Sequence, residues 1–513
     1  MDEQSSYPKF YYAAAAGFGA MLPLGFAPFS LSLLPILSLI GLLAIWQKGN
    51  RRQTLLSAWS FGTGLYAVGA SWVFVSIYVY SATPLILAII LTALFVLIMG
   101  FITAIQGYLF HLLGLNRMVL LGFPALWVAF EWIKSWLFTG FPWLYLGYAM
   151  TDTPVQGFAP ITGIYGISAI TAFAATLGFV LLQQIFQASP KLKWTALGTA
   201  ACFIAIPVTG HFLQKIQWTE KADNSALSVS IIQGNIPQEI KWDLQFRDAI
   251  LNLYLERTET NWDSDLIIWP EAAIPAFEHE VSDYLNTLHQ RAKDQGSSLI
   301  LGLAIMHYLN DDKFLFYNSI RSIGTGEGLY HKQRLVPFGE FVPFEDQIRG
   351  LTGAFNLPMS SFTPGDENQA PLLAAGHRIA PYICYEILFP DLVARTSRHA
   401  EILVTISNDG WFGHSAGPAQ HFEMARMRAI ETGRYLIRAT NNGISAIVDP
   451  KGKVTHLAPS FVETTLNGEV YAMQGNTPFM EWGSLPVLIL SGIILLACSI
   501  LSLLRKSPSS SAG

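Results

Sequence analysis

The sequence has few charged side chains, and those it has are unevenly distributed. Only 13% of the 513 residues are Asp, Glu, Lys or Arg, against about 25% in ordinary soluble domains. Residues 1–214 contain 12 of these charges, whereas residues 215–513 contain 55. The first part is therefore predicted to lie in a membrane, and most of the second part in water. The net charge of −5 shows no basic excess, which argues against nucleic-acid binding.

Cysteine is also scarce. Cys202 and Cys498 lie in apolar runs, so Cys384 is the only thiol in the polar part of the chain. An internal disulfide in that part is thereby excluded. The sequence also lacks metal-ligand spacings, a phosphate-binding loop and a dinucleotide fingerprint. We therefore expect neither a metal nor another cofactor.

Long apolar runs predict eight membrane-spanning helices. They cover residues 11–28, 31–46, 54–78, 84–113, 117–136, 160–186, 194–213 and 484–504. A cleaved signal peptide is the alternative for the first run. If the spans alternate in direction, the Lys and Arg residues of the short loops fall on one side, which marks it as cytoplasmic.

This topology predicts three parts. Residues 1–214 form a seven-span region, residues 215–482 form a domain outside the cytoplasm, and residues 483–513 form the eighth span and a short cytoplasmic tail. From residue 226 onward, short apolar runs alternate with polar helical stretches. This alternation predicts a layered α/β domain, and strands that are apolar at consecutive positions suit sheets covered on both faces.

Three polar side chains lie at or near the ends of predicted strands, where ligand sites gather in α/β folds. Glu271 follows "LIIWP", Lys332 lies in "YHKQRLVPFGEFVP", and Cys384 follows "APYI". Taken singly, each has an ordinary explanation as a helix cap, a solvated loop lysine or an inert buried thiol. Together they supply a base, a cation and a nucleophile, which is what acyl transfer through a thiol needs.

Seven ordered motifs carry a resemblance to a known family. They are "QGNIPQEIKWD" (233–243), "IIWPEAAIP" (267–275), "LVPFGEFVP" (335–343), "LPMSSF" (357–362), "ICYE" (383–386), "TISNDGWFG" (405–413) and "ARMRAIE" (425–431). The polar domain resembles the nitrilase, or carbon-nitrogen hydrolase, superfamily. The whole chain, spans included, resembles the apolipoprotein N-acyltransferases of Gram-negative bacteria.

The resemblance implies a polytopic α-helical membrane bundle joined to a nitrilase-like α–β–β–α sandwich. It also implies a place in the bacterial inner membrane, with the catalytic domain in the periplasm. Glu271 would be the general base, Lys332 the stabiliser of an oxyanion, and Cys384 the nucleophile. The family's supporting positions match Glu340, Tyr385, Glu386 and Trp242.

The implied reaction transfers an acyl chain from a phospholipid, through a thioester on Cys384, to the N-terminal amine of diacylglyceryl-cysteine in an apolipoprotein. The partners would then be a phospholipid donor, a diacylated apolipoprotein acceptor and the membrane. We expect the aromatic stretch 138–154 and the Pro/Phe-rich loop 335–362 to form the lipid-access surface. The alternative is that the Phe residues of these segments fill the core of the domain.

Two alternatives stay open on the residues alone. One is a membrane-anchored amidase or nitrilase that acts on small amides. The other is a non-catalytic module that binds lipid or lipoprotein. The amidase shares the three polar residues but has no need of eight spans.

Overall fold

The computed structural model describes residues 7–81, 83–186, 192–310, 313–343 and 362–504. The chain divides into two compact units. The helical unit comprises Met1–Phe74, Leu85–Ile216 and Trp482–Gly513, and the sheet unit comprises Val75–Pro84 and Gln217–Glu481. Residues 75–78, predicted as the end of the third span, thus group with the sheet unit.

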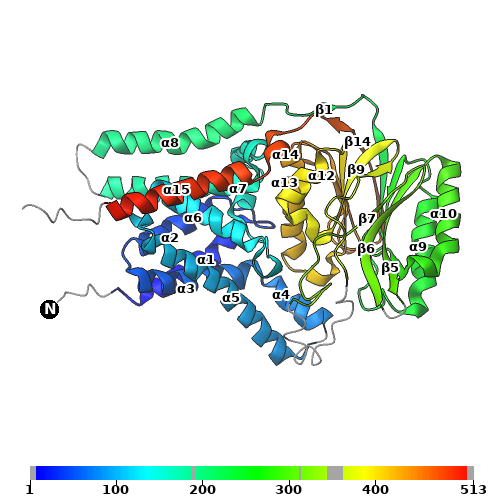
Figure 1. Ribbon diagram of the computed structural model, residues 1–513, viewed down its shortest axis with the longest axis horizontal. Helices are drawn as coiled ribbons and strands as arrows, with labels where there is room; N and C mark the ends of the chain where they lie inside the picture. Colours follow the sequence, from blue (N-terminus) through cyan, green and yellow to red (C-terminus); the bar gives the residue numbers. More distant parts are fainter. Residues whose placement is uncertain (1–6, 82, 187–191, 311–312, 344–361, 505–513) are drawn as a thin grey trace, which may run out of the picture. The chain divides into compact units, whose positions relative to one another are not determined.

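The helical unit is built from apolar helices (Figure 1). Their bounds are α1 Phe10–Met21, α2 Leu33–Trp46, α3 Arg51–Gly69, α4 Trp72–Val75, α5 Leu85–Leu112, α6 Val119–Lys134, α7 Ala159–Phe186, α8 Leu192–Leu213 and α15 Leu485–Leu504. In the part of the chain that the structure describes, four helical stretches are long and apolar enough to cross a membrane. The count becomes five if Arg51–Gly69 and Trp72–Tyr80, which are bent by 56°, form one span.

The remaining predicted spans are shorter as helices than their apolar runs. α1 has 12 residues and α2 has 14, which correspond to about 18–21 Å at 1.5 Å per residue. A straight span needs about 30 Å. After α1 the chain passes into the 3₁₀ turn Leu22–Gly25, where Pro23 has no N–H to continue the α-helical ladder.

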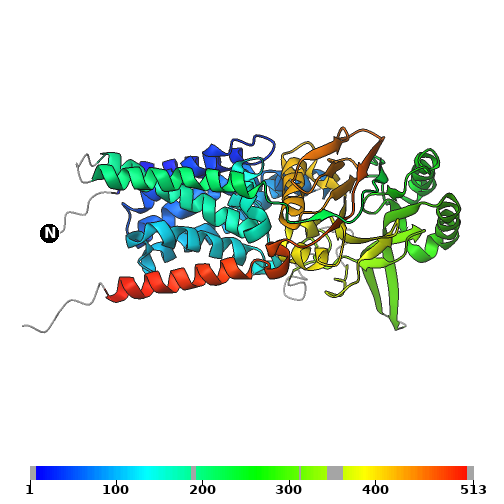
Figure 2. The ribbon, with the colours of Figure 1, turned by 90° about the horizontal axis from the view of Figure 1, so that it is seen from above.

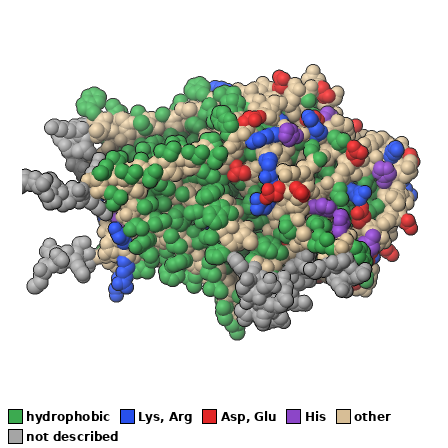
Figure 3. Space-filling model, in the orientation of Figure 1, with side chains coloured by type: hydrophobic (Ala, Val, Ile, Leu, Met, Phe, Trp, Pro, Cys, Tyr) green, Lys and Arg blue, Asp and Glu red, His purple; other side chains and the backbone are tan. Residues whose placement is uncertain are grey.

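Apolar side chains cover most of the face of the helical unit that Figure 3 shows. Ile86 on α5, Phe212 on α8 and Leu496 on α15 are each more than 60% exposed. A continuous apolar surface of this kind is typical of contact with lipid or another apolar partner. The helices are therefore consistent with a membrane protein.

Part of the aromatic stretch 138–154 lies inside the helical unit instead of on its surface. Trp143, Tyr145 and Tyr148 are at most 1% exposed. The carboxylate of Glu131 accepts hydrogen bonds from Leu146 N at 2.7 Å and from Trp127 Nε1 at 2.9 Å. A buried acceptor for the backbone explains why this irregular segment can pack among helices. These residues therefore do not form the predicted lipid-access surface.

The sheet unit is a sandwich of two sheets between helices, as predicted (Figure 1). One sheet has the order β14–β2–β3–β5–β6–β7, with β4 beside β5, and the other has the order β13–β12–β11–β10–β9–β8. The strands are β2 Leu227–Gln233, β3 Leu266–Ile268, β4 Ile274–Phe277, β5 Ser298–Asn310, β6 Lys313–Gly324, β7 Leu329–His331, β8 Leu372–Ala374, β9 His377–Ile383, β10 Ile402–Ser407, β11 Leu436–Thr440, β12 Ala446–Val448, β13 Val454–Leu457 and β14 Thr464–Val470.

Helices cover both outer faces of the sandwich. They are α9 Arg247–Glu259 and α10 Ser282–Gln295 on the first sheet, and α12 Pro390–Ser397 and α13 Gly417–Thr432 on the second (Figure 1). The β5–β6 hairpin, green in Figure 2, projects beyond the other strands of its sheet. Strands β2, β3 and β5 run parallel, and so do β9, β10 and β11. Their carboxyl ends therefore meet at common edges.

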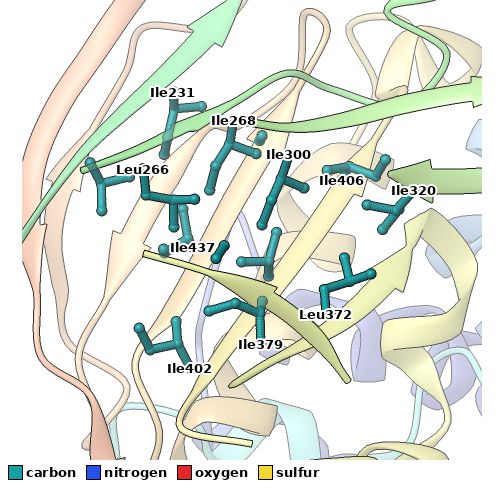
Figure 4. Packing of buried hydrophobic residues seen from close by; sticks show 14 of the residues in the cluster. Ile231, Leu266, Ile268, Ile300, Ile320, Leu372, Ile379, Ile402, Ile406 and Ile437 are labelled. Atoms are coloured by element: carbon teal, nitrogen blue, oxygen red, sulfur yellow. The ribbon is translucent and has the colours of Figure 1, made fainter. Parts of the chain in front are cut away.

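The main core lies between the two sheets (Figure 4). Ile231 and Ile268 from the first sheet and Ile379 from the second belong to it, and all three are fully buried. Because successive strand residues point to opposite faces, Ile232 and Ile267 belong instead to the core under α9 and α10. This double burial accounts for the consecutive apolar positions in the sequence.

Candidate active site

Glu271 lies in the turn between β3 and β4, and its carboxylate is held at both oxygens. Asn318 Nδ2 donates to Oε1 at 2.8 Å, and the backbone N of Asn408 donates to Oε2 at 2.9 Å. Asn318 comes from β6, and Asn408 directly follows β10. The two sheets thus jointly orient one carboxylate whose residue is only 8% exposed.

Lys332 directly follows β7 and is 1% exposed. Its Nζ lies 2.9 Å and 2.8 Å from the two oxygens of Glu340, and 3.5 Å from Glu271 Oε1. Burial by itself would lower the pKa of Lys332, but the charges of Glu340 and Glu271 outweigh burial and raise it above its ordinary value. The side chain is therefore a fixed ammonium between two carboxylates.

Cys384 stands at the junction of β9 and the 3₁₀ helix η9, Cys384–Leu388, and is partly buried. Burial raises the pKa of its thiol to about 12, the charge of Glu271 adds to the rise, and Lys332 opposes it. At neutral pH the resting sulfur therefore carries its proton. A thiolate forms here only if a base removes that proton as the sulfur reacts.

Glu386 is fully buried and connects the nucleophile strand to the lysine loop. One oxygen accepts from Ile383 N at 2.8 Å, and the other accepts from Tyr330 Oη at 2.9 Å and from Gln333 N at 2.6 Å. Burial raises the pKa of Glu386 to about 7, although these donors counteract the rise. Its neighbour Tyr385 is 7% exposed.

The structure brings an unpredicted lysine to the site. Lys241 is 2% exposed, and its Nζ donates to the carbonyl oxygen of Glu271 at 2.9 Å. The next residue, Ala272, has a φ of 47°, a strained value for a residue with a side chain. Trp242, which matches a supporting position of the family, lies partly buried in the turn beside Lys241. The "KW" pair in the motif 233–243 marked the right segment, but not which residue reaches Glu271.

Asn318 and Asn408 were also not among the predicted site residues. Asn318 Nδ2 bridges the two carboxylates, since it also donates to Glu340 Oε1 at 2.8 Å. Asn408 belongs to the motif 405–413, whereas Asn318 stands in β6 next to other polar residues such as Ser319 and Arg321, so no local signal distinguished it. Part of the predicted lipid-access loop, residues 344–361, lies outside the described residues, including most of the "LPMSSF" motif.

The described residues contain no group of three or more His, Cys, Asp or Glu side chains arranged to hold a metal ion. What the site does contain is a carboxylate and an ammonium, and the charges of both act on the Cys384 thiol. Such a set can remove a proton, attack a carbonyl carbon and stabilise the oxyanion that results.

Two family models match the chain along its length. Residues 18–177 match the apolipoprotein N-acyltransferase N-terminal domain, and residues 228–475 match the carbon-nitrogen hydrolase domain. An apolipoprotein N-acyltransferase of Azotobacter vinelandii is 40% identical over 512 residues, which cover 99% of this chain and 97% of the relative. The chain belongs to the apolipoprotein N-acyltransferase family.

Other members of the family are similarly close. The apolipoprotein N-acyltransferase of Pseudomonas paraeruginosa is 41% identical over 96% of this chain and 95% of its own length. That of Coxiella burnetii is 39% identical over 93% of this chain and 97% of its own length. The likeness to these N-acyltransferases therefore extends over both units.

Proposed function

We propose that this chain transfers an acyl chain from a phospholipid to the α-amine of an N-terminal diacylglyceryl-cysteine in an apolipoprotein. Its family membership over 99% of its length supports this reaction. The observation that carries the mechanism is the Lys332 ammonium, held between Glu340 and Glu271 with its charge acting on the Cys384 thiol. The proposed steps use these side chains and need no metal ion or cofactor.

In the first half-reaction Glu271 accepts the thiol proton while Sγ of Cys384 attacks the ester carbonyl carbon of the phospholipid. The carbonyl oxygen becomes an oxyanion that faces Lys332. The ester C–O bond then breaks, and Glu271 returns the proton to the departing alkoxide. A lysophospholipid leaves, and Cys384 carries the acyl chain as a thioester.

In the second half-reaction the neutral amine of the lipoprotein attacks the thioester carbonyl carbon. Glu271 accepts the proton that the nitrogen loses, and Lys332 again faces the oxyanion. The C–S bond breaks, sulfur takes the proton from Glu271, and an amide is released. Because the first product leaves before the second substrate reacts, the kinetics are ping-pong.

The membrane arrangement belongs to the same proposal. We infer eight spans, with α1 and α2 as the shortest of them. Residues 1–214 and the helix of 483–513 would lie in the bacterial inner membrane, residues 215–482 in the periplasm and the short C-terminal tail in the cytoplasm. Moving an acyl chain into water costs about 0.8 kcal/mol per CH₂, so an enzyme acting on two lipids benefits from staying in the bilayer. Phe338, which is 57% exposed in the loop that carries Glu340, is suited to contact a lipid chain there.

The function is tested with the purified full-length chain, a phospholipid bearing a labelled acyl chain, and a diacylated lipopeptide. We expect a labelled, triacylated lipopeptide together with a lysophospholipid. Preferred transfer of the label to water would favour the amidase-type hydrolase. Lipid binding without any turnover would favour the non-catalytic module.

Replacing Lys241 with Met is expected to lower kcat by about 10- to 100-fold. The change removes the donor to the Glu271 carbonyl and leaves the strained Ala272 turn less well held. Glu256→Gln, on the exposed side of α9, is a suitable control. Initial rates of lipopeptide acylation measure the effect, and an unchanged kcat in Lys241→Met would contradict it.

Lys241 also gives a pH-dependent prediction for stability. Burial lowers its pKa to about 8, against the opposing charge of Glu271. Between pH 8 and the ordinary lysine pKa of about 10.4, Lys241 is therefore protonated more often in the unfolded chain than in the folded one. Stability from this group increases as the pH rises through that range. We expect the Tm of the wild type, relative to Lys241→Met, to increase across that window. A constant difference would show that Lys241 does not titrate there.

Glu386→Gln is expected to lower both Tm and kcat, the latter by about tenfold or more. An amide placed with its oxygen toward Tyr330 turns its NH₂ toward Ile383 N, so two donors face each other beside Cys384. Tyr330→Phe removes only one donor and leaves the carboxylate, so its kcat should stay within about threefold of wild type. Equal losses in both variants would contradict a specific role for the Ile383 contact.

A further inference from the structure

The backbone at Cys384 has an uncommon conformation. Its φ is 52°, in the left-handed region that residues with a Cβ seldom adopt. Such strained residues persist only where the surrounding contacts hold them. Because the bend stands between β9 and η9, it determines the direction in which the thiol leaves the strand. The contacts that hold the bend therefore affect the chemistry.

Two hydrogen bonds hold the backbone near this bend. Glu386 accepts from Ile383 N, just before the thiol. On the other side, the carbonyl oxygen of Cys384 lies 3.1 Å from His421 Nε2. His421 comes from α13 and is 1% exposed. It has no part in the proposed proton transfers, and no sequence motif singled it out.

The neighbours of His421 determine which ring nitrogen carries the proton. Arg438 Nη2 lies 3.1 Å from His421 Nδ1 and 2.8 Å from Asp409 Oδ2. The carbonyl oxygen of Cys384 can only accept, so Nε2 must carry a proton, and in the neutral ring Nδ1 is then the acceptor that faces the Arg438 guanidinium. Burial and the charge of Arg438 lower the pKa of His421, which keeps the ring neutral. The Nε2–H therefore points at the Cys384 carbonyl.

Asp409 completes this buried network. Its Oδ1 lies 3.1 Å from His421 Nδ1 and accepts from Ser407 Oγ at 2.7 Å. Burial alone would raise the pKa of Asp409, but the charge of Arg438 is the largest opposing effect, and the pKa lies below its ordinary value. The carboxylate thus balances the charge of Arg438, so the network holds a neutral imidazole beside a paired charge. The ring of Phe412 also packs edge-on against the His421 ring, with 5.9 Å between the ring centroids.

We propose that His421 is a positioning residue for the nucleophile, with its Nε2–H holding the Cys384 carbonyl. Arg438 faces Nδ1 as a donor, and Asp409 balances the charge of Arg438. This inference rests on the proposed function, in which Cys384 attacks the donor ester. On this proposal, His421 affects the rate at which Cys384 attacks the ester and does not affect substrate binding.

The test compares His421→Gln with His421→Leu in the full chain. Gln places an amide N–H where Nε2 stood and an oxygen that can accept from Arg438, whereas Leu keeps the bulk without a donor. We expect Leu to lower kcat by about 100-fold with KM changed less than about twofold, and Gln to restore kcat to within about fivefold of wild type. A kcat within twofold of wild type for Leu, or equal losses for Gln and Leu, would overturn the proposal.

A second readout separates this inference from the acyl-transfer reaction. The rate of Cys384 alkylation by iodoacetamide, followed on the Cys384 peptide by mass spectrometry, requires no lipid substrate. We expect it to change in His421→Leu and to return toward wild type in His421→Gln. Unchanged alkylation in His421→Leu would overturn the positioning role even if acyl transfer is established. Retained acyl transfer in Cys384→Ser would instead overturn the proposed function.

A matched control accounts for simple loss of stability. Met424 lies on the same helix as His421 and is 2% exposed. Met424→Ala should lower Tm through lost packing while kcat and alkylation per folded molecule stay unchanged. If Met424→Ala lowers both as much as His421→Leu, the effect belongs to α13 packing, and the proposal fails.

Discussion

Replacement of Cys384 by Ser is expected to lower acyl transfer by roughly four or more orders of magnitude. The site already raises the pKa of the thiol to about 12, chiefly through burial. A hydroxyl in the same place holds its proton much more tightly, so Glu271 would be too weak a base to generate the attacking oxygen anion. The loss should fall on kcat, because the substitution leaves the size of the side chain nearly unchanged.

The measurement is a trapping experiment. Full-length protein is incubated with a phospholipid carrying a labelled acyl chain, then denatured and treated with neutral hydroxylamine. We expect the wild type to retain label that hydroxylamine releases, as a thioester requires, and Cys384→Ser to retain none. Cys202→Ser, which changes an exposed thiol of the helical unit, should label like the wild type. Label that survives in Cys384→Ser and is released by hydroxylamine would place the acyl group on another residue.

The sandwich and three of its polar strand ends could be predicted from the sequence for a simple physical reason. Strands such as β10 are apolar at consecutive positions because both of their faces are covered, and the polar run after Ser407 then marks the strand end. Parallel strands bring such ends to one edge. Glu271, Lys332 and Cys384 could thus be selected together before any contact between them was known.

The contacts that hold those residues could not be predicted in the same way. Lys241 reaches Glu271 across 30 residues, and Asn408 reaches it across 137. Nothing in the local sequence around either donor indicates which carbonyl or carboxylate it meets. His421 is likewise one of 11 histidines, and only the fold shows that its ring faces the Cys384 carbonyl.

The membrane part shows a different limit. Hydropathy locates apolar runs, but it does not distinguish a helix that crosses a bilayer from a shorter apolar helix. α1 and α2 illustrate this, as does the bend of 56° between Arg51–Gly69 and Trp72–Tyr80. Composition predicts that the aromatic stretch 138–154 belongs to the lipid-access surface, because the buried Glu131 carboxylate that lets part of it pack inside is not visible in a pattern of hydrophobicity.

Lys332→Met is expected to lower kcat at least about 1,000-fold, since it removes the cation that faces the oxyanion. It should also lower Tm, because Glu340 and Glu271 then share a buried site without their counter-ion. Breaking a buried ion pair costs about 3–5 kcal/mol. Lys332→Arg should fail as well. The planar guanidinium is larger than the ammonium it replaces, and the Lys332 side chain is only 1% exposed, so the surrounding residues leave no room for the larger group.

A double variant separates the two effects. Lys332→Met combined with Glu340→Gln removes one charge of each sign, so the buried site keeps the same net charge as the wild type. We expect the second substitution to recover most of the lost Tm, measured by thermal unfolding in detergent, while acyl transfer stays at the level of Lys332→Met. Recovery of acyl transfer along with Tm would mean that Lys332 serves only to neutralise Glu340. The oxyanion would then need a different donor, and the backbone N–H groups near Cys384 would be the next candidates.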